Sequence, residues 1–165
     1  MKSTWITLLI MLSSGTAMAA NVTAPVREVV EATARNWAEG STGQEEEVFS
    51  TDRLSRLFSK DFASAFEAAS KNPPHDIPEG ETTGFPFDYD PIAQGQDGCP
   101  FEDIRIEDDG DGQVTALFDN RSCFGDGDAP DTVLIFHVVE EGGRSVIDDI
   151  YPVENGQSGS SIKQD

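Results

Sequence analysis

Residues 85–99, which read FPFDYDPIAQGQDGC, divide this chain into a half with helical patterning and a half with strand patterning. Within this stretch Asp88 and Asp90 flank Tyr89, and one proline stands two residues before the first aspartate while another directly follows the second. A proline fixes its own φ at about −65° and favours extended geometry in the residue before it. We therefore expect a stiff polar loop, with the rest of the chain arranged around it.

Residues 1–19 have the form of a secretory signal peptide. Lys2 precedes an apolar run at 5–12, and the triplet 17–19 is Ala-Met-Ala, a small-residue cleavage signal. The apolar run is shorter than the roughly 20 residues that span a bilayer. We expect cleavage after Ala19 or Ala20, a periplasmic or secreted protein and no membrane span in the mature chain; a retained N-terminal anchor is the alternative.

The chain is strongly acidic, with 31 Asp plus Glu against 11 Lys plus Arg and a formal charge of −20. Nucleic acid is excluded as a partner, because binding it requires cationic neutralisation of phosphates. The charge fits either a merely solvated surface or a cationic partner. Apart from the signal peptide at 1–19, the length of the chain predicts one domain, at 22–153. Residues 154–165 are rich in Gly, Ser and Gln and are expected to form a flexible tail.

Helical spacing dominates the first half of the mature chain. We predict a helix capped by Thr23, with Pro25 in its first turn and an apolar face that begins at Val26. A second helix is expected to open at Thr51, and a third at the N-cap Ser59. The aromatic residues on these helices have the spacing of a core face and are interpreted as core.

Residues 72–98 contain five prolines and no sustained periodicity, which predicts an unusually long loop. His75 within it is interpreted as an exposed loop histidine. The pair Asp88 and Asp90 fits an acid and base, or two acceptors that hold the turn. We favour the structural role, and extend the hypothesis of backbone N–H acceptance to Gln96 and Asp97.

A period of two marks the second half of the chain. The turn sequence 109–112, Asp-Gly-Asp-Gly, separates two alternating strands and predicts a hairpin. Residues 133–139 are apolar on both faces, which indicates a central strand covered on both sides, and 146–151 form a last strand. His137 on the central strand is therefore expected to be buried or half-buried, as a core histidine or a catalytic one.

The two cysteines are predicted to form a disulfide. If the hairpin turns within 109–112, facing residues have numbers that sum to about 221, and 99 plus 123 gives 222. Cys99 and Cys123 are then cross-strand neighbours within one residue, and an exported location supplies the oxidising environment.

No cofactor or metal site is predicted. An EF-hand alignment on Gly112 places Phe118 where the bidentate glutamate belongs, so that match fails. The acidic run 125–131 remains an alternative for weak calcium binding. Zinc spacing, a phosphate-cradling loop and a nucleophile elbow are missing from the sequence.

The order of these parts resembles the nuclear transport factor 2-like superfamily, and more narrowly a bacterial exported family of unknown function within it. Residues 57–62, 88–92 with 95–97, and 146–151 carry the resemblance, which covers 22–151. It implies an α+β fold in which N-terminal helices pack on a curved, mainly antiparallel sheet of about four strands. The superfamily includes enzymes, binding modules and partner proteins, so it does not imply one function.

The sequence favours a non-enzymatic module that binds a small ligand or a basic protein, and no residue is assigned a catalytic role. A hydrolase or isomerase with an acid and histidine pocket is one alternative, and a neutralising partner of a secreted toxin is another. The candidate binding residues are Asp88, Tyr89, Asp90, Gln96, Asp97, His137 and Tyr151.

The acidic residues themselves gather in four short stretches. They are 45–47, 107–111, 126–131 and 140–141. All four are predicted connectors, so we expect the loops to carry the negative field and to present it at one end of the fold.

Overall fold

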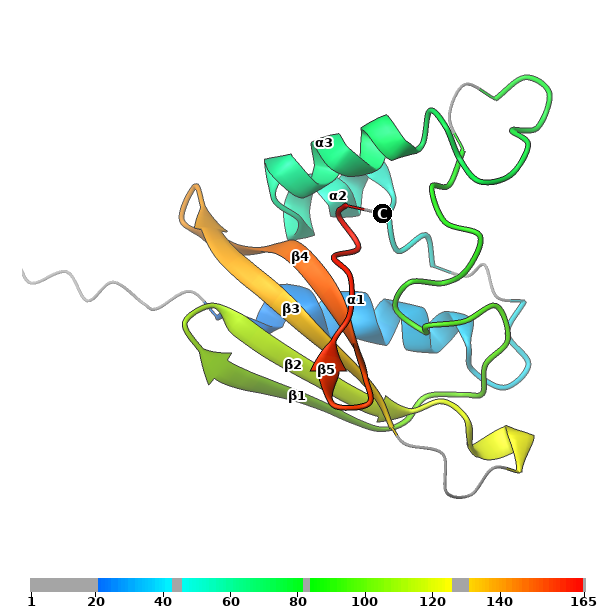
Figure 1. The fold of residues 1–165 in the computed structure, drawn as a ribbon. Coiled ribbons are helices and arrows are strands. Elements are labelled where there is room, and N and C mark those ends of the chain that lie inside the picture. Colours follow the sequence, from blue (N-terminus) through cyan, green and yellow to red (C-terminus); the bar gives the residue numbers. More distant parts are fainter. Residues whose placement is uncertain (1–20, 43–45, 82–83, 126–130, 165) are drawn as a thin grey trace, which may run out of the picture.

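Helices precede an antiparallel sheet in the chain, which makes the fold α+β as predicted (Figure 1). The computed structural model describes residues 21–42, 46–81, 84–125 and 131–164. The helices are α1 (Thr23–Asn36), α2 (Thr51–Leu57), α3 (Lys60–Ala69) and the short 3-10 helix η1 (Ser122–Phe124). The strands are β1 (Glu102–Gly110), β2 (Gln113–Asp119), β3 (Thr132–Glu141), β4 (Arg144–Glu154) and β5 (Gln157–Ser158).

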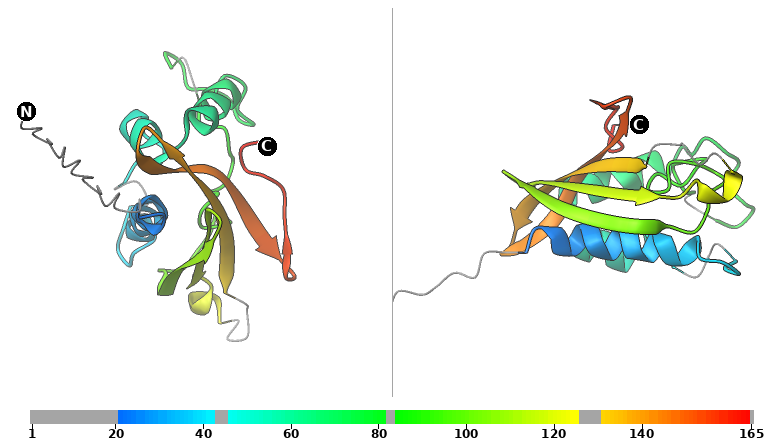
Figure 2. Two further views of the ribbon diagram at one scale, coloured as in Figure 1. Left: turned by 90° about the vertical axis from the view of Figure 1, so that its left-hand side faces the viewer. Right: turned by 90° about the horizontal axis from the view of Figure 1, so that it is seen from below.

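The sheet is a meander in which each strand pairs with the next one along the chain, in the order β1-β2-β3-β4-β5. Figure 2 shows that the sheet is strongly twisted and that α1 runs along one of its faces. The described residues thus form one strand more than the expected four, because the two residues of β5 pair with the end of β4.

Helix α1 packs on the sheet through the apolar face that its spacing predicts. Val26, Val29 and Val30 are fully buried, and the helix contacts β1, β2 and β4. Its start differs from the prediction, since the Asn21 side chain accepts hydrogen bonds from the backbone N–H and the hydroxyl of Thr23. The Asn21 side chain therefore accepts an unpaired N–H group at the start of the helix, in place of the capping role predicted for Thr23.

The junction between α2 and α3 is attached to β4. The hydroxyl of Ser59 accepts the N–H of Phe62 at 2.9 Å, which confirms Ser59 as the N-cap of α3, and it donates to Asp148 at 2.7 Å. The backbone N–H of Ser59 donates to the carbonyl of Ile147 at 2.8 Å. This junction places α3 over the sheet, with Phe58 and Phe62 in the core.

Strand β3 is covered on one face only, so the prediction of a doubly covered strand is wrong. Leu134, Phe136 and Val138 are buried against the helices, while Val139 on the other face is 40 % exposed and His137 is also exposed. Both faces are apolar in sequence, but the helices pack against only one.

The predicted hairpin and disulfide are both confirmed. Strand β1 ends at Gly110 and β2 begins at Gln113, and Ile106 pairs with Ala116 across the hairpin. Cys99 and Cys123, which flank this hairpin, are joined by a disulfide with a Cα–Cα distance of 5.6 Å.

The C-terminal segment packs on the domain, against the expectation of a flexible tail at 154–165. Ser161 and Ile162 are buried, and the N–H of Ile162 donates to the carbonyl of Ile150 at 2.9 Å. The Ser161 hydroxyl donates to the buried Asp149 at 2.6 Å. We call residues 159–164 the C-terminal strap.

None of the helices in the described ranges is long and apolar enough to cross a membrane. The predicted signal peptide at 1–19 lies outside those ranges.

Candidate functional site

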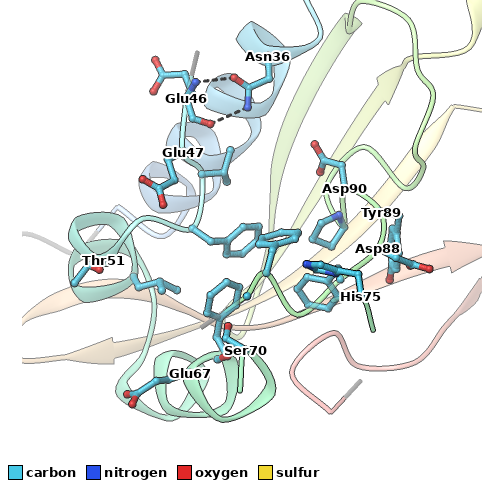
Figure 3. A pocket seen from close by; sticks show the side chains of 18 of the residues that line it. Asn36, Glu46, Glu47, Thr51, Glu67, Ser70, His75, Asp88, Tyr89 and Asp90 are labelled. Atoms are coloured by element: carbon cyan, nitrogen blue, oxygen red, sulfur yellow. Dashed lines mark hydrogen bonds between the residues drawn. The ribbon is translucent and has the colours of Figure 1, made fainter. Parts of the chain in front are cut away.

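An open cleft of about 1520 Å³ lies between the helices and the long loop that returns to the sheet (Figure 3). Its walls are the C-terminal end of α1, residues 46–55 with the start of α2, helix α3, and the long loop at positions 75, 81 and 84–96. Within the described chain, the strands contribute no lining residue. The sheet therefore supports the cleft from behind, and the proline-rich loop forms one complete side of it.

Aromatic rings fill the middle of the cleft. The ring of Phe49 lies 5.2 Å from Phe66, 5.8 Å from Phe85 and 6.5 Å from Phe87, measured between centroids. Phe87 in turn contacts Tyr89 at 5.9 Å. These separations are those of favourable stacked and edge-to-face pairs. We call these five side chains the aromatic floor; within it Phe85 is 39 % exposed.

Acidic side chains surround the aromatic floor, and Figure 3 shows Glu47, Glu67, Asp88 and Asp90 around the rings in the centre of the view. The acidic lining residues are Glu46, Glu47, Glu67, Glu81, Asp88 and Asp90. Among the residues that the structure describes, no Lys or Arg lines the cleft. A cleft with one sign of charge and apolar walls concentrates the electric field, so it favours cations.

The wall that carries Phe49 is fixed by two sets of polar contacts. The side-chain amide of Asn36 donates to the Glu46 carbonyl at 2.8 Å and accepts the Glu46 N–H at 2.7 Å. The Glu46 carboxylate pairs with Arg53 and Arg35, and hydrogen bonds from these two arginines, Arg53 first, lower its pKa. Glu46 is thus structural and already neutralised.

Four of the cleft carboxylates have no ion-pair partner within the described ranges; they are Glu47, Glu81, Asp88 and Asp90. Asp90 accepts hydrogen bonds from uncharged donors only. Glu47 precedes α2, whereas Glu81 and Asp88 belong to the long loop. Glu67, by contrast, lies 3.4 Å from Lys71. The uncompensated negative charge is therefore distributed around the cleft and not held at one point.

Asp90 holds the loop closed, which confirms the structural role predicted for it. Its Oδ1 accepts the N–H groups of Ile92 at 2.9 Å and Ala93 at 3.0 Å. Its Oδ2 accepts the indole N–H of Trp37 at 2.9 Å. The backbones of Asp90 and Gly95 also exchange hydrogen bonds at 3.0 and 3.3 Å. Both carboxylate oxygens of Asp90 are therefore occupied.

The same acceptor role is wrong for Asp88, Gln96 and Asp97. The Asp88 carboxylate accepts no hydrogen bond from the described residues, and only its backbone carbonyl is an acceptor. Gln96 lines the cleft, but its amide acts as a donor, to the Asp88 carbonyl at 2.8 Å. Asp97 is exposed and does not line the cleft, and its carboxylate accepts no hydrogen bond from the described residues. The carboxylate of Asp90 instead accepts the N–H groups of Ile92 and Ala93, which directly follow it in the turn.

His137 and Tyr151 lie on the face of the sheet away from the helices, apart from the cleft. Their rings are 4.8 Å apart. His137 is exposed, so its predicted burial is wrong, because no helix covers this face of β3. The pKa of Tyr151 is raised by a hydrogen bond with Asp149 and by partial burial.

Of the seven candidate binding residues, the cleft brings together Asp88, Tyr89, Asp90 and Gln96. Sequence reasoning missed the other aromatic residues of the floor. Phe66 was assigned to the core with its helix, whereas Phe85 stands in the long loop, where a large apolar residue has no periodic reason to be. His75, predicted to be exposed, is exposed but also lines the cleft.

Asn120 is a further residue that the sequence did not indicate. It is buried, and its amide donates to the carbonyl of Ala93 at 2.8 Å while its side-chain oxygen accepts the Thr132 hydroxyl at 2.7 Å. Its backbone carbonyl accepts the N–H of Cys99 at 3.0 Å. Asn120 thereby joins the loop to β3 beside the disulfide.

The described residues hold no group of three or more His, Cys, Asp or Glu side chains arranged to bind a metal ion. Residues 126–130, most of the alternative calcium run, lie outside the described ranges.

Comparisons with family models, with curated proteins and with solved structures found no match for this chain.

Proposed function

We propose that this protein is an exported, non-enzymatic module that binds a cationic ligand, or a cationic surface of another protein, in the cleft. One observation carries the proposal: partly exposed aromatic rings are surrounded by carboxylates, and no described Lys or Arg lines the site. Aromatic faces attract cations, and the neighbouring carboxylates add a Coulombic attraction.

The hydrogen bonds of Asp90 favour a binding function over catalysis. A general base must reach a substrate proton through a free oxygen. Both oxygens of Asp90 are engaged by Trp37, Ile92 and Ala93, and His137 lies on another face of the fold. A hydrolase or isomerase that uses Asp90 with His137 therefore has the weaker support.

A neutralising partner of a secreted toxin is the second candidate for the same site. An interface of that kind relies on aromatic anchors in a polar rim, and Phe85 within the acidic rim has that form. The export that both candidates require is supported by the disulfide between Cys99 and Cys123, since such bonds persist in oxidising compartments.

Membership of the nuclear transport factor 2-like superfamily remains part of this proposal. Its support is the order of helices before an antiparallel sheet and the packing of α1 on one face of that sheet.

The test is an NMR titration of the purified protein with benzyltrimethylammonium, with benzenesulfonate as the anionic counterpart. We expect amide shifts in residues 46–49, 66–70 and 84–96 with the cation only, and a loss of binding as salt is raised. Shifts on the outer face of the sheet, or equal shifts with the anion, would contradict the proposal.

A charge-matched pair of variants separates the cleft from the overall charge. The triple variant Glu47→Gln, Glu81→Gln, Asp88→Asn should bind the cation at least several-fold more weakly. The control replaces three exposed glutamates outside the cleft by Gln and has the same net charge; they are Glu102, Glu107 and Glu154. The control should bind as the wild type does.

A further inference from the structure

We infer that the ligand of the cleft is a short, extended basic peptide segment that carries one large apolar anchor, presented by a protein partner. This inference rests on the proposed function and names the class of ligand. Size, anchor and charge spacing each argue for it.

The cleft is too large for a small cation alone. Its volume is about 1520 Å³, whereas sites for drug-sized molecules measure about 300–1,000 Å³. It is also open, with walls from four separate parts of the chain. A ligand that fills such a site is several amino acids long.

Phe85 supplies the docking point for an apolar anchor. It is 39 % exposed although it lies edge-on to Phe66 at 5.9 Å and to Phe87 at 5.5 Å. The residue before it is held in place, because the N–H of Gly84 donates to the Ser70 carbonyl at 2.8 Å. A Cβ on Gly84 would lie 2.7 Å from the ring of Pro73, so only glycine allows this close approach. A rigidly held, exposed aromatic side chain is typical of a binding hot spot.

The charges require a ligand with more than one cationic group. Glu47, Glu81 and Asp88 have no ion-pair partner in the described residues; Glu47 precedes α2, and the other two belong to the long loop. Figure 3 shows Glu47 and Asp88 on opposite sides of the aromatic rings, so a single ammonium group lies near only one of these two. A linear polyamine could pair with several, but it has no apolar group to cover Phe85. Lysine or arginine residues on both sides of an aromatic or large aliphatic residue meet both conditions.

The experiment is a selection from a random heptapeptide library displayed on phage, with the full purified protein as bait. We expect enrichment of peptides with at least two basic residues and one aromatic or large aliphatic residue. The synthetic consensus peptide should bind at least tenfold more tightly than benzyltrimethylammonium. A peptide with serine at the anchor position, and a linear polyamine, should each lose at least fivefold against the consensus.

Two variants tie the selection to the site. Phe85→Ser should weaken the consensus peptide at least fivefold. The variant also loses ring contacts with Phe49, Phe66 and Phe87, so peptide binding is compared at a temperature at which circular dichroism shows both proteins folded. The triple variant at Glu47, Glu81 and Asp88 should weaken it as strongly, while the charge-matched control outside the cleft should not.

The outcomes separate the two proposals. If benzyltrimethylammonium shifts the cleft amides but no basic peptide is enriched, or if enriched peptides bind Phe85→Ser unchanged, the ligand is a small cation and the peptide inference is wrong. If neither the cation nor any peptide binds in the cleft, the proposed function fails as well.

Discussion

Asp90 makes more hydrogen bonds than any of the other aspartates near the cleft, and they join parts of the chain that are distant in sequence. Its two oxygens accept from Trp37 at the end of α1 and from Ile92 and Ala93 in the loop. Hydrogen bonds to a charged acceptor are the stronger kind. The shape of the loop therefore depends on this one carboxylate.

Asp90→Asn should lower the free energy of unfolding by about 1 to 3 kcal/mol. The amide that replaces one oxygen leaves an N–H donor without an acceptor, either the indole N–H of Trp37 or the turn N–H groups. Asp97→Asn is the matched control, since Asp97 is exposed, and should change stability by less than about 0.5 kcal/mol. Urea unfolding of both variants measures this; equal effects would contradict the role given to Asp90.

Gly112 in the β1–β2 turn is required by both conformation and space. It has φ +79°, and a Cβ there would lie 2.5 Å from the carbonyl oxygen of Val138. Gly110 has φ +87° but has nothing within 4 Å of its Cβ position. A substitution at Gly110 therefore tests backbone strain alone, whereas one at Gly112 tests backbone strain and steric contact together.

Gly110→Ala should cost about 1 to 2 kcal/mol for the left-handed backbone alone. Gly112→Ala should cost about 1 to 3 kcal/mol more, because β2 and β3 must move apart at the Val138 carbonyl. Thermal unfolding followed by circular dichroism compares them. A Gly112→Ala protein as stable as Gly110→Ala would show that the turn relaxes without cost.

Among the elements, the disulfide closes the hairpin at the end opposite its turn. Cys99 lies ahead of β1 and Cys123 lies in η1, 24 residues later. Its replacement by two serines, Cys99→Ser with Cys123→Ser, should lower the free energy of unfolding by about 3 to 4 kcal/mol, since the unfolded chain regains the entropy of an open loop of this length. Guanidinium unfolding of the double variant measures the loss. A difference below about 1 kcal/mol would argue against this account.

The C-terminal strap joins α3 to β4 through Lys163. The ammonium group donates to Asp61 at 2.9 Å and to Asp148 at 3.1 Å. Burial acts to lower the pKa of Lys163, but the two hydrogen bonds outweigh it and raise the pKa to about 12. Burial acts to raise the pKa of Asp148, and hydrogen bonds from Ser59 and Lys163 outweigh it, so the pKa is lowered.

Lys163→Met should lower the free energy of unfolding by about 1 kcal/mol near neutral pH. Because the pKa of Lys163 is raised in the folded protein, its charge stabilises the fold fully at any pH below the pKa of an unfolded lysine, about 10.4. This stabilisation is lost as pH rises through the folded pKa of about 12. Because the pKa of Asp148 is lowered in the folded protein, its charge stabilises the fold at any pH above the pKa of an unfolded aspartate, about 3.9. This stabilisation is lost as pH falls through the folded pKa.

The difference between wild type and Lys163→Met should therefore be constant from about pH 5 to 9 and decrease at both extremes. Lys71→Met is the control, because its pair with Glu67 is exposed and should contribute less than about 0.5 kcal/mol. Urea unfolding across the pH range measures both variants. A difference that does not change with pH would mean that Lys163 acts through packing alone.

The elements that could be predicted from sequence are those set by local signals. Ser59 as an N-cap and the glycine-rich turn at 109–112 need only their neighbours in the chain. The packing of the strap depends on where Ile162 and Lys163 land in space, and the surrounding Gly, Ser and Gln residues have the composition of a disordered tail. The exposed face of β3 was missed because apolar residues on both faces do not tell which one the helices cover.

The part of the cleft that could be predicted from sequence is the part formed by residues close together in the chain. Asp88, Tyr89, Asp90 and Gln96 stand in one loop, so their proximity follows from the sequence. Phe49 comes from another segment, and its contact with the loop follows only from the packing of α2 and α3.

At the scale of the whole molecule, the negative charge is not gathered at one end. Residues 107–110 belong to β1 and Glu140 and Glu141 belong to β3, so they are strand ends and not the predicted connectors. In Figure 1 the turns of these two hairpins lie at the end away from the long loop and its cleft. Glu45 and residues 126–130 lie outside the described ranges.

Under the proposed function, the attraction for a cation comes from the carboxylates of the cleft together with the total charge of −20. The association rate of the selected basic peptide should fall about tenfold between low and high salt, as expected for electrostatic steering. Stopped-flow fluorescence of Trp37, which lines the cleft, measures the rate. A rate that is flat across the salt series would rule out steering, and the triple cleft variant should lose more of the slope than the charge-matched control.

The packing of α1 on β4 has a consequence for the order in which the chain can fold. A chain leaves the ribosome N-terminus first. Helix α1 is made at the beginning, yet one of the strands it contacts, β4, and the buried Ile162 of the strap are made at the end. Until nearly the last residue emerges, the valines of α1 have no complete surface to pack against. The nascent chain thus presents an apolar helix that is only partly covered by β1 and β2 until β4 has emerged, and this is the segment on which a chaperone would act.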